Sequence, residues 1–173
     1  MIDFSVEDTL KNFFYQYSPF YDKKSSKIYF TVRKGDRLFD DENIFTVRYK
    51  DRKTSGTMPF EFLNTENNEG TVSLSGSGDY LVFTYCVMDF KKNSCDLYYS
   101  QKVNGAWESP KKFNDKINSE FWDSQPNLYN DILFFVSNIP TFRLGHLRIL
   151  MQLIVNVPEL KFLPYTGYRT VRT

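Results

Sequence analysis

The chain has 173 residues, and its 22 Lys and Arg nearly balance 21 Asp and Glu, so a formal charge of +1 excludes a broad field that attracts nucleic acid or anionic lipid. Aromatic residues make up 18% of the sequence and alanine occurs only at Ala106, a composition that favours β-strands over helices. The single histidine, His146, excludes most histidine-based catalysis and any histidine-rich metal site, and no apolar run reaches the roughly 18 residues of a spanning helix.

The start of the chain shows no targeting signal. Residues 1–8 carry acidic side chains and no basic segment ahead of an apolar stretch, so they predict no signal peptide and, considered alone, a cytoplasmic product. The first predicted strands follow at residues 18–20 and 28–31, around a polar turn at 22–27. A further strand is expected around residues 43–45.

The middle of the chain has the clearest strand pattern. Turns are expected at residues 76–79, around 91–94 and at Asn104-Gly105, where an Asn-Gly pair between two strands is a strong hairpin signal. Residues 75–78 are interpreted as a turn and not as a phosphate loop, because no lysine follows and a strand comes next. The expected strands are residues 71–74, 80–87, 95–103 and 107–113.

A third copy of this pattern has expected strands at residues 125–128 and 133–136. The three copies share one period, because Phe30, Phe83 and Phe135 are spaced 53 and 52 residues apart. Four antiparallel strands in about 50 residues is the size of one β-propeller blade. A β-sandwich with evenly spaced hairpins is the alternative that the pattern leaves open.

The last part of the chain, residues 139–173, differs from the rest. It carries a formal charge of +4, whereas residues 1–138 carry −3. Its apolar stretch 144–155 is compatible with a helix, either as a cap or as a membrane segment, although the stretch is short for a membrane and contains Arg148. We favour a third interpretation, a frameshift after about Asn138, because another reading frame can restore the expected strand motif.

One group of motifs extends from the second copy into the third. These motifs resemble the TolB-type, WD-like β-propeller repeat of OmpA-family outer-membrane proteins. That repeat runs from a Ser-x-Asp-Gly turn into a Leu-Tyr-Phe-Thr-Ser strand, followed by Asp-Ile-Tyr, Asn-Gly-x-Trp, Pro and Ile-Asn-Ser/Thr. The chain departs from it at Ser77-Gly78 and in a third turn that is two residues short. The matching residues are 73–84, 94–98, 104–107, Pro110, 118–120 and 124–126.

The resemblance covers roughly residues 15–138. It implies an all-β fold, an incomplete β-propeller of two to three four-stranded antiparallel blades in residues 1–138, with an atypical tail at 139–173. It also implies an extracytoplasmic scaffold, part of a longer parent protein that lies in the periplasm, associated with the outer membrane. Such proteins bind peptidoglycan through a further domain, and some belong to type IX secretion machinery. The blade cores are expected near residues 17–49, 71–113 and 125–138.

Two cysteines lie in the best-preserved copy. Cys86 ends one expected strand and Cys95 begins the next. If these strands pair as a hairpin, the side chains come close enough for a disulfide, which persists in an oxidising compartment such as the periplasm. A pair of reduced, half-buried thiols is the alternative, and a metal site is disfavoured because two further ligands are missing. With the family resemblance, the cysteine pair favours a segment lost upstream of this chain.

Carboxylates are the remaining candidates for catalysis, because some propellers are glycosidases. The candidates are Glu69, Asp123 and Asp22, which we interpret as solvated turn acids that bind nearby backbone N–H groups. The acidic run at residues 40–43 offers oxygens for calcium but lacks the spacing and glycine of a recognised loop. Aromatic side chains that could stack on a sugar or peptide, but that blade cores also use, are Tyr98, Tyr99, Trp107, Phe121 and Trp122.

The sequence therefore predicts a non-enzymatic interaction scaffold with an unidentified protein partner. It predicts no cofactor, no metal, no nucleic-acid partner and no transmembrane helix. One alternative is a truncated, glycosidase-like propeller hydrolase that uses carboxylates. Another is a small cytoplasmic β-protein with a helical cap, which reduced cysteines would favour.

Overall fold

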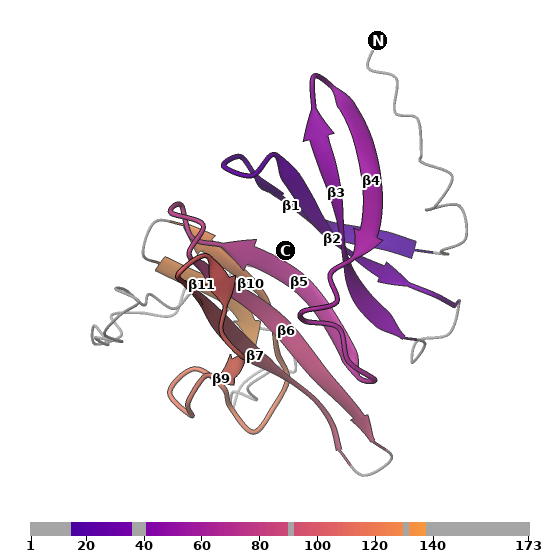
Figure 1. Ribbon diagram of the computed structural model, residues 1–173. Coiled ribbons are helices and arrows are strands. Elements are labelled where there is room, and N and C mark those ends of the chain that lie inside the picture. Colours follow the sequence, from indigo (N-terminus) through magenta and orange to yellow (C-terminus); the bar gives the residue numbers. More distant parts are fainter. Residues whose placement is uncertain (1–14, 36–40, 90–91, 130–131, 138–173) are drawn as a thin grey trace, which may run out of the picture.

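The computed structural model describes residues 15–35, 41–89, 92–129 and 132–137, which form three antiparallel sheets (Figure 1). No helix occurs among these residues, so the expected all-β class is confirmed. The tail at 139–173, with its predicted helical cap, membrane segment or frameshift, lies outside the described residues. Asp40 also lies outside them.

Sheet 1 contains four strands in chain order. β1 (Tyr15–Asp22), β2 (Lys27–Arg33), β3 (Glu42–Lys50) and β4 (Lys53–Pro59) follow one another across the sheet. The side chain of Asp22 accepts hydrogen bonds from the Lys24 backbone N–H and the Ser25 hydroxyl, which closes the turn between β1 and β2. The sequence predicted the first three strands but not β4, whose residues are mostly polar and exposed.

Sheet 2 contains β5 (Asn68–Leu74), β6 (Tyr80–Asp89) and β7 (Lys92–Val103). The expected fourth strand at 107–113 is divided into two short strands, β8 (Ala106–Trp107) and β9 (Lys111–Lys112), which both pair with β7. Pro110 lies between them and has no backbone N–H to donate, which disfavours a continuous ladder. The Asn104-Gly105 turn joins β7 and β8 as predicted, with both residues at positive φ.

Sheet 3 contains β10 (Asp123–Tyr129) and β11 (Ile132–Ser137). The three sheets pack in series. β5 lies against β1, β2 and β3, and β10 lies against β5, β6 and β7, so the first strand of each sheet contacts the sheet before it. Figure 1 shows sheet 2 between the other two. The described strands do not close into a ring.

Two apolar clusters fill the spaces between the sheets. Neighbouring residues of β6 contribute to different clusters, because Phe83 faces sheet 1 whereas Val82 faces sheet 3. The first cluster also contains Tyr29, Ile44, Leu63, Val72, Leu74 and Leu81. The second also contains Leu97, Phe113, Ile117, Leu133 and Phe135.

A bulge recurs in the first strand of each sheet. Ser18, Thr71 and Gln125 have positive φ angles of 51°, 46° and 53°, and the strand register shifts at each of them. These three residues are 53 and 54 positions apart, the same period as in the sequence. The backbone therefore repeats a local irregularity that the sequence motifs did not predict.

Candidate functional site

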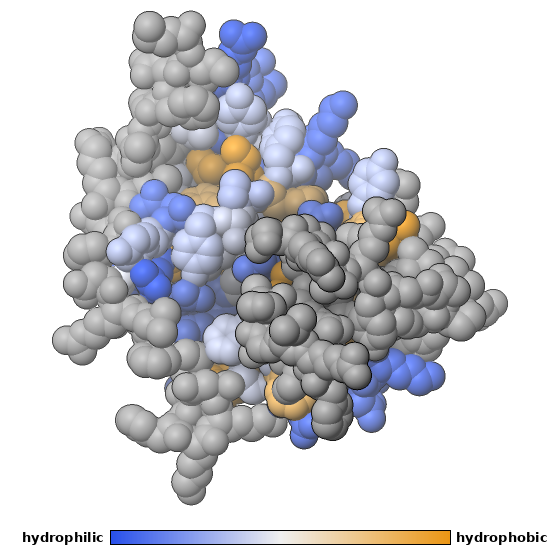
Figure 2. All heavy atoms as spheres, turned by 180° about the vertical axis from the view of Figure 1, so that it is seen from behind, coloured by the Kyte–Doolittle hydropathy of each residue, from blue (hydrophilic) through white to orange (hydrophobic). Residues whose placement is uncertain are grey.

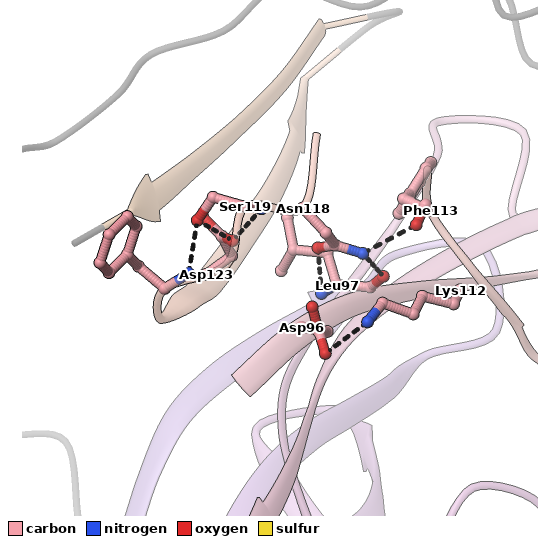
Figure 3. Close-up of polar contacts among 8 residues, drawn as sticks. Asp96, Leu97, Lys112, Phe113, Asn118, Ser119 and Asp123 are labelled. Atoms are coloured by element: carbon pink, nitrogen blue, oxygen red, sulfur yellow. Dashed lines mark hydrogen bonds and ion pairs between the residues drawn. The ribbon is translucent and has the colours of Figure 1, made fainter. Parts of the chain in front are cut away.

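The most extensive polar site among the described residues is the junction between sheets 2 and 3 (Figure 3). Its centre is Asn118, which is 4% exposed. The Asn118 Oδ1 atom accepts the Leu97 backbone N–H at 2.7 Å, and Nδ2 donates to the Leu97 and Phe113 carbonyl oxygens at 3.0 Å each. The amide thus binds the backbone of β7 and fixes the segment that leads into sheet 3.

The residue after Asn118 continues the junction. Ser119 donates from its backbone N–H and its hydroxyl to Asp123 Oδ2, at 2.6 and 2.8 Å. Its hydroxyl oxygen also accepts the Phe121 backbone N–H at 3.1 Å. These bonds shape the tight turn that begins β10. The Asp123 side chain is fully buried, and its Oδ1 atom has no hydrogen-bond partner in the described part of the chain.

An equivalent junction lies between sheets 1 and 2. Asn64 Oδ1 accepts the Ile44 backbone N–H at 2.8 Å, and Nδ2 donates to the Ile44 carbonyl oxygen at 2.9 Å. Thr65 donates from its backbone N–H and its hydroxyl to the two carboxyl oxygens of Glu69. Burial raises the pKa of Glu69, and the two bonds from Thr65 oppose part of this shift.

The two candidate carboxylates therefore have a different environment from the one expected. Glu69 and Asp123 were predicted to be solvated, but both side chains are fully buried. They are buried because the first strand of each sheet packs onto the sheet before it. Each binds local backbone N–H groups in its own junction, and the third candidate, Asp22, binds the turn between β1 and β2. The three acids therefore belong to three separate turns of the fold.

The candidate aromatic side chains do not form one surface. Trp107 stacks on Phe62 with ring centroids 6.3 Å apart, whereas Tyr99 packs on Phe113 at 4.7 Å in the second cluster. Tyr98 packs on Tyr85 at 5.0 Å, and Trp122 is exposed. Seen from behind, apolar residues of the described part are bordered by hydrophilic residues (Figure 2). Tyr98 and Trp107 pack against the first cluster and Tyr99 against the second, so these three aromatic residues serve the cores between the sheets, as blade cores would use them.

The acidic run 40–43 contributes one exposed ion pair, from Asp41 to Lys34 at 3.9 Å. In the described ranges, no group of three or more His, Cys, Asp or Glu residues is placed to hold a metal ion. The same ranges contain no helix that is long and apolar enough to cross a bilayer.

Cys86 and Cys95 are direct register partners in β6 and β7. Their Cα atoms are 4.0 Å apart, the two sulfur atoms are bonded, and both residues are buried. They share a face with Thr84 and Leu97, the face on which sheet 3 packs. The bond therefore lies at the junction between sheets 2 and 3.

A shallow hollow lies beside this junction. Lys112 at its rim forms an ion pair with Asp96 at 2.7 Å. Residues that line it are Lys112, Phe113, Asn114, Asp115, Asn118, Ser119 and Glu120. The sequence analysis did not identify the two asparagines. The signal that could have found them is that residues 63–66 match residues 117–120: each contains an Asn followed by Ser or Thr, with an acid five residues after the Asn.

A comparison with known protein-family models and with curated proteins finds no match to this chain.

Proposed function

We propose that this chain is a non-enzymatic interaction scaffold, made of blade-like units of a β-propeller of the TolB type. The observation that carries the proposal is the repeated junction. Asn64 and Asn118, 54 residues apart, each bind the backbone N–H and C=O of a buried aliphatic residue in the third strand of their sheet. A unit that repeats both its strands and its linking bonds is typical of solenoids and propellers, which act mainly as binding platforms.

The proposed location is the periplasm, with the parent protein associated with the outer membrane and with peptidoglycan through a further domain. The bonded pair Cys86 and Cys95 supports an oxidising compartment, because such bonds rarely persist in a reducing cytoplasm. The family resemblance of the motifs in residues 73–126 supports the same location.

The proposal is tested by fractionating cells of the source organism, labelling free thiols and cross-linking the chain to its neighbours. We expect the chain in the envelope fraction, with both cysteines oxidised and with cross-links to other envelope proteins. Recovery from the cytoplasm with two free thiols would overturn it.

A second measurement addresses the hydrolase alternative. The purified chain is assayed with chromogenic glycosides, together with the variants Glu69→Gln and Asp123→Asn. We expect no turnover by any of the three proteins, because both carboxylates bind their own backbone turns. Turnover that either variant abolishes while the variant remains folded would contradict the proposal and favour the hydrolase.

A further inference from the structure

The Cys86–Cys95 disulfide lies on one particular face of sheet 2. Because side chains alternate between the two faces of a strand, Cys86 shares its face of β6 with Val82 and Thr84. In β7, Cys95 shares that face with Leu97. Val82 and Leu97 both belong to the apolar cluster between sheets 2 and 3. The disulfide is therefore on the face against which sheet 3 packs.

The residue pair next to the disulfide on this face holds sheet 3 in place. This pair is Thr84 and Leu97, which are register partners. Thr84 Oγ1 accepts the backbone N–H of Gln125 in β10 at 3.1 Å. The Leu97 backbone N–H donates at 2.7 Å to Asn118 Oδ1, in the segment that leads into sheet 3 (Figure 3). The bonds that attach sheet 3 thus begin two residues from each cysteine.

Strand β10 runs along this face toward the disulfide. The Leu128 backbone N–H donates to Ser73 Oγ at 2.9 Å, and Ser73 is the register partner of Val82. Gln125 is bonded to Thr84, two residues after Val82 in β6. β10 therefore advances along β6 in the direction of the disulfide as its residue numbers fall, and it packs on both β6 and β7.

The burial of the two cysteines couples the bond to this packing. Cys95 is 0% exposed and Cys86 is 7% exposed. Thiol–disulfide exchange requires that an attacking thiolate reaches a sulfur atom, so a buried bond resists reductants until its cover moves away. Conversely, two separate thiols need more room than a bonded pair, and a close-packed interior provides that room only when a neighbour moves.

We propose that the Cys86–Cys95 disulfide and the packed sheet 3 form a redox-sensitive lock. The bond holds the hairpin of β6 and β7 in the register that sheet 3 binds, and sheet 3 shields the bond from reductants. Because the coupling is reciprocal, breaking the bond weakens the attachment of sheet 3, and loosening sheet 3 exposes the bond. This inference concerns the fold itself and does not depend on the proposed scaffold function.

The reductant that opens the lock is a dithiol. One of its thiolates attacks the sulfur of Cys86, the more exposed residue, and the sulfur of Cys95 leaves as a thiolate and takes up a proton. The second thiol of the reductant then attacks the mixed disulfide and releases Cys86. The cysteines gain two electrons and two protons, and the dithiol becomes a cyclic disulfide.

Hydrogen exchange of the full chain tests the effect of the bond on sheet 3. Mass spectrometry compares the oxidised chain with the chain reduced by dithiothreitol. Amides of residues 123–129 and 132–137 should exchange at least about tenfold faster after reduction, because sheet 3 opens more often. Amides of residues 27–33 and 42–50, in sheet 1, should change by less than about twofold.

A matched pair of variants tests the effect of sheet 3 on the bond. Thr84→Val removes the acceptor for Gln125, and Thr31→Val removes the equivalent acceptor for Thr71 at the junction of sheets 1 and 2. Thr84→Val should speed up reduction by dithiothreitol at least about fivefold, measured by counting free thiols, because it costs the attachment of sheet 3 one buried hydrogen bond. Thr31→Val should stay within about twofold of the parent chain, because it loosens the junction away from the disulfide.

Circular dichroism checks that both variants are folded. If either is not, Asn118→Ala and Asn64→Ala give the same comparison at the same two junctions. Equal rates of reduction in the two members of a pair would overturn the inference, because the bond would then be reached without selective opening of sheet 3. Unchanged exchange of sheet 3 after reduction would show that the bond does not hold it. Reduction of the folded parent chain as fast as of the urea-unfolded chain would show that sheet 3 gives no shield.

Discussion

Asn118 satisfies both backbone groups of Leu97, a residue that is fully buried in the second core cluster. An amide suits this position because its oxygen accepts the Leu97 N–H while its NH2 group donates to the Leu97 and Phe113 carbonyl oxygens. Asn64 has the same role at Ile44. At the scale of single residues, the link between successive sheets is therefore an amide that completes the hydrogen bonding of the preceding sheet.

Replacing Asn118 by alanine should lower the free energy of unfolding by about 1–3 kcal/mol, because it leaves the buried N–H of Leu97 without a partner, whereas the Leu97 carbonyl oxygen keeps the bond from the Phe113 backbone N–H. Urea titration followed by circular dichroism measures the change. The control is Asn127→Ala, at an exposed position of β10, which should stay within about 0.5 kcal/mol of the parent chain. Equal losses in the two variants would argue against the role of Asn118 as the link between the sheets.

Glu69 should make stability depend on pH. Burial raises its folded-state pKa above the ordinary value of 4.5, so the folded chain holds this proton more tightly than the unfolded chain. This bound proton therefore stabilises the folded chain relative to the unfolded chain. The stabilisation is complete below about pH 4.5 and is lost as the pH rises through the raised pKa of Glu69.

Urea titrations at several pH values test this linkage. The difference in unfolding free energy between the parent chain and Glu69→Gln should fall as the pH rises. Glu66→Gln, which removes an exposed carboxyl from the same segment, is the charge-matched control. A difference that grows with pH would show that the bonds from Thr65 outweigh burial and that the pKa of Glu69 is lowered by folding.

At the scale of elements, the bulges set how one sheet meets the next. The backbone N–H of Thr71 donates to Thr31 Oγ1 at 3.0 Å, and that of Gln125 donates to Thr84 Oγ1 at 3.1 Å. The left-handed conformation at each bulge exposes this N–H, and a threonine of the preceding sheet accepts it. Val136 occupies the equivalent position in β11 and has no oxygen to accept such a bond.

The disulfide should stabilise the hairpin of β6 and β7. Cys86 and Cys95 close a short loop of sequence separation nine, for which chain entropy predicts about 2–3 kcal/mol. Adding a reductant should therefore lower the melting temperature of the chain, measured by calorimetry with thiol counting. The variant Cys86→Ala/Cys95→Ala should melt at a temperature that the reductant does not change. A parent chain with the same insensitivity, although its thiols are reduced, would contradict the prediction.

At the scale of the whole molecule, stability depends on contacts between successive sheets. Sheet 2 has a neighbour on each face, whereas sheets 1 and 3 each have one neighbour among the described strands. Phe30, Val32 and Val47 form a further, buried apolar cluster on the other face of sheet 1. If the described sheets are blades of the proposed propeller, three of them are too few to close a ring, because propellers typically have four to eight blades.

We therefore expect the purified chain to self-associate. Sedimentation velocity should show species larger than the 20.5 kDa monomer, and the melting temperature should rise with protein concentration. The physical reason is that the end sheets of a repeat array leave strand edges that another chain can pair with. A cooperative melt of a strict monomer, with a midpoint independent of concentration, would argue against this expectation.

The sequence by itself determined the elements that depend on local pattern. Runs rich in aromatic and aliphatic residues predicted β6 and most of β7, and Asn104-Gly105 predicted the turn after them, because strand propensity and turn chemistry act over a few residues. The same local reasoning failed for β4, which has little apolar pattern, and for the fourth strand of sheet 2, which is divided near Pro110.

Only the tertiary structure decided which polar groups are buried and what they bind. In sequence, Glu69 and Asp123 are two acids in turns, and Asn64 and Asn118 are two polar residues in loops. Packing of β5 and β10 onto the preceding sheets removes water from both acids, and it brings each asparagine to the edge of a strand about 20 residues earlier. Burial and long-range hydrogen bonds depend on which sheet lies opposite, and that is a property of the assembled fold and not of any local window of sequence.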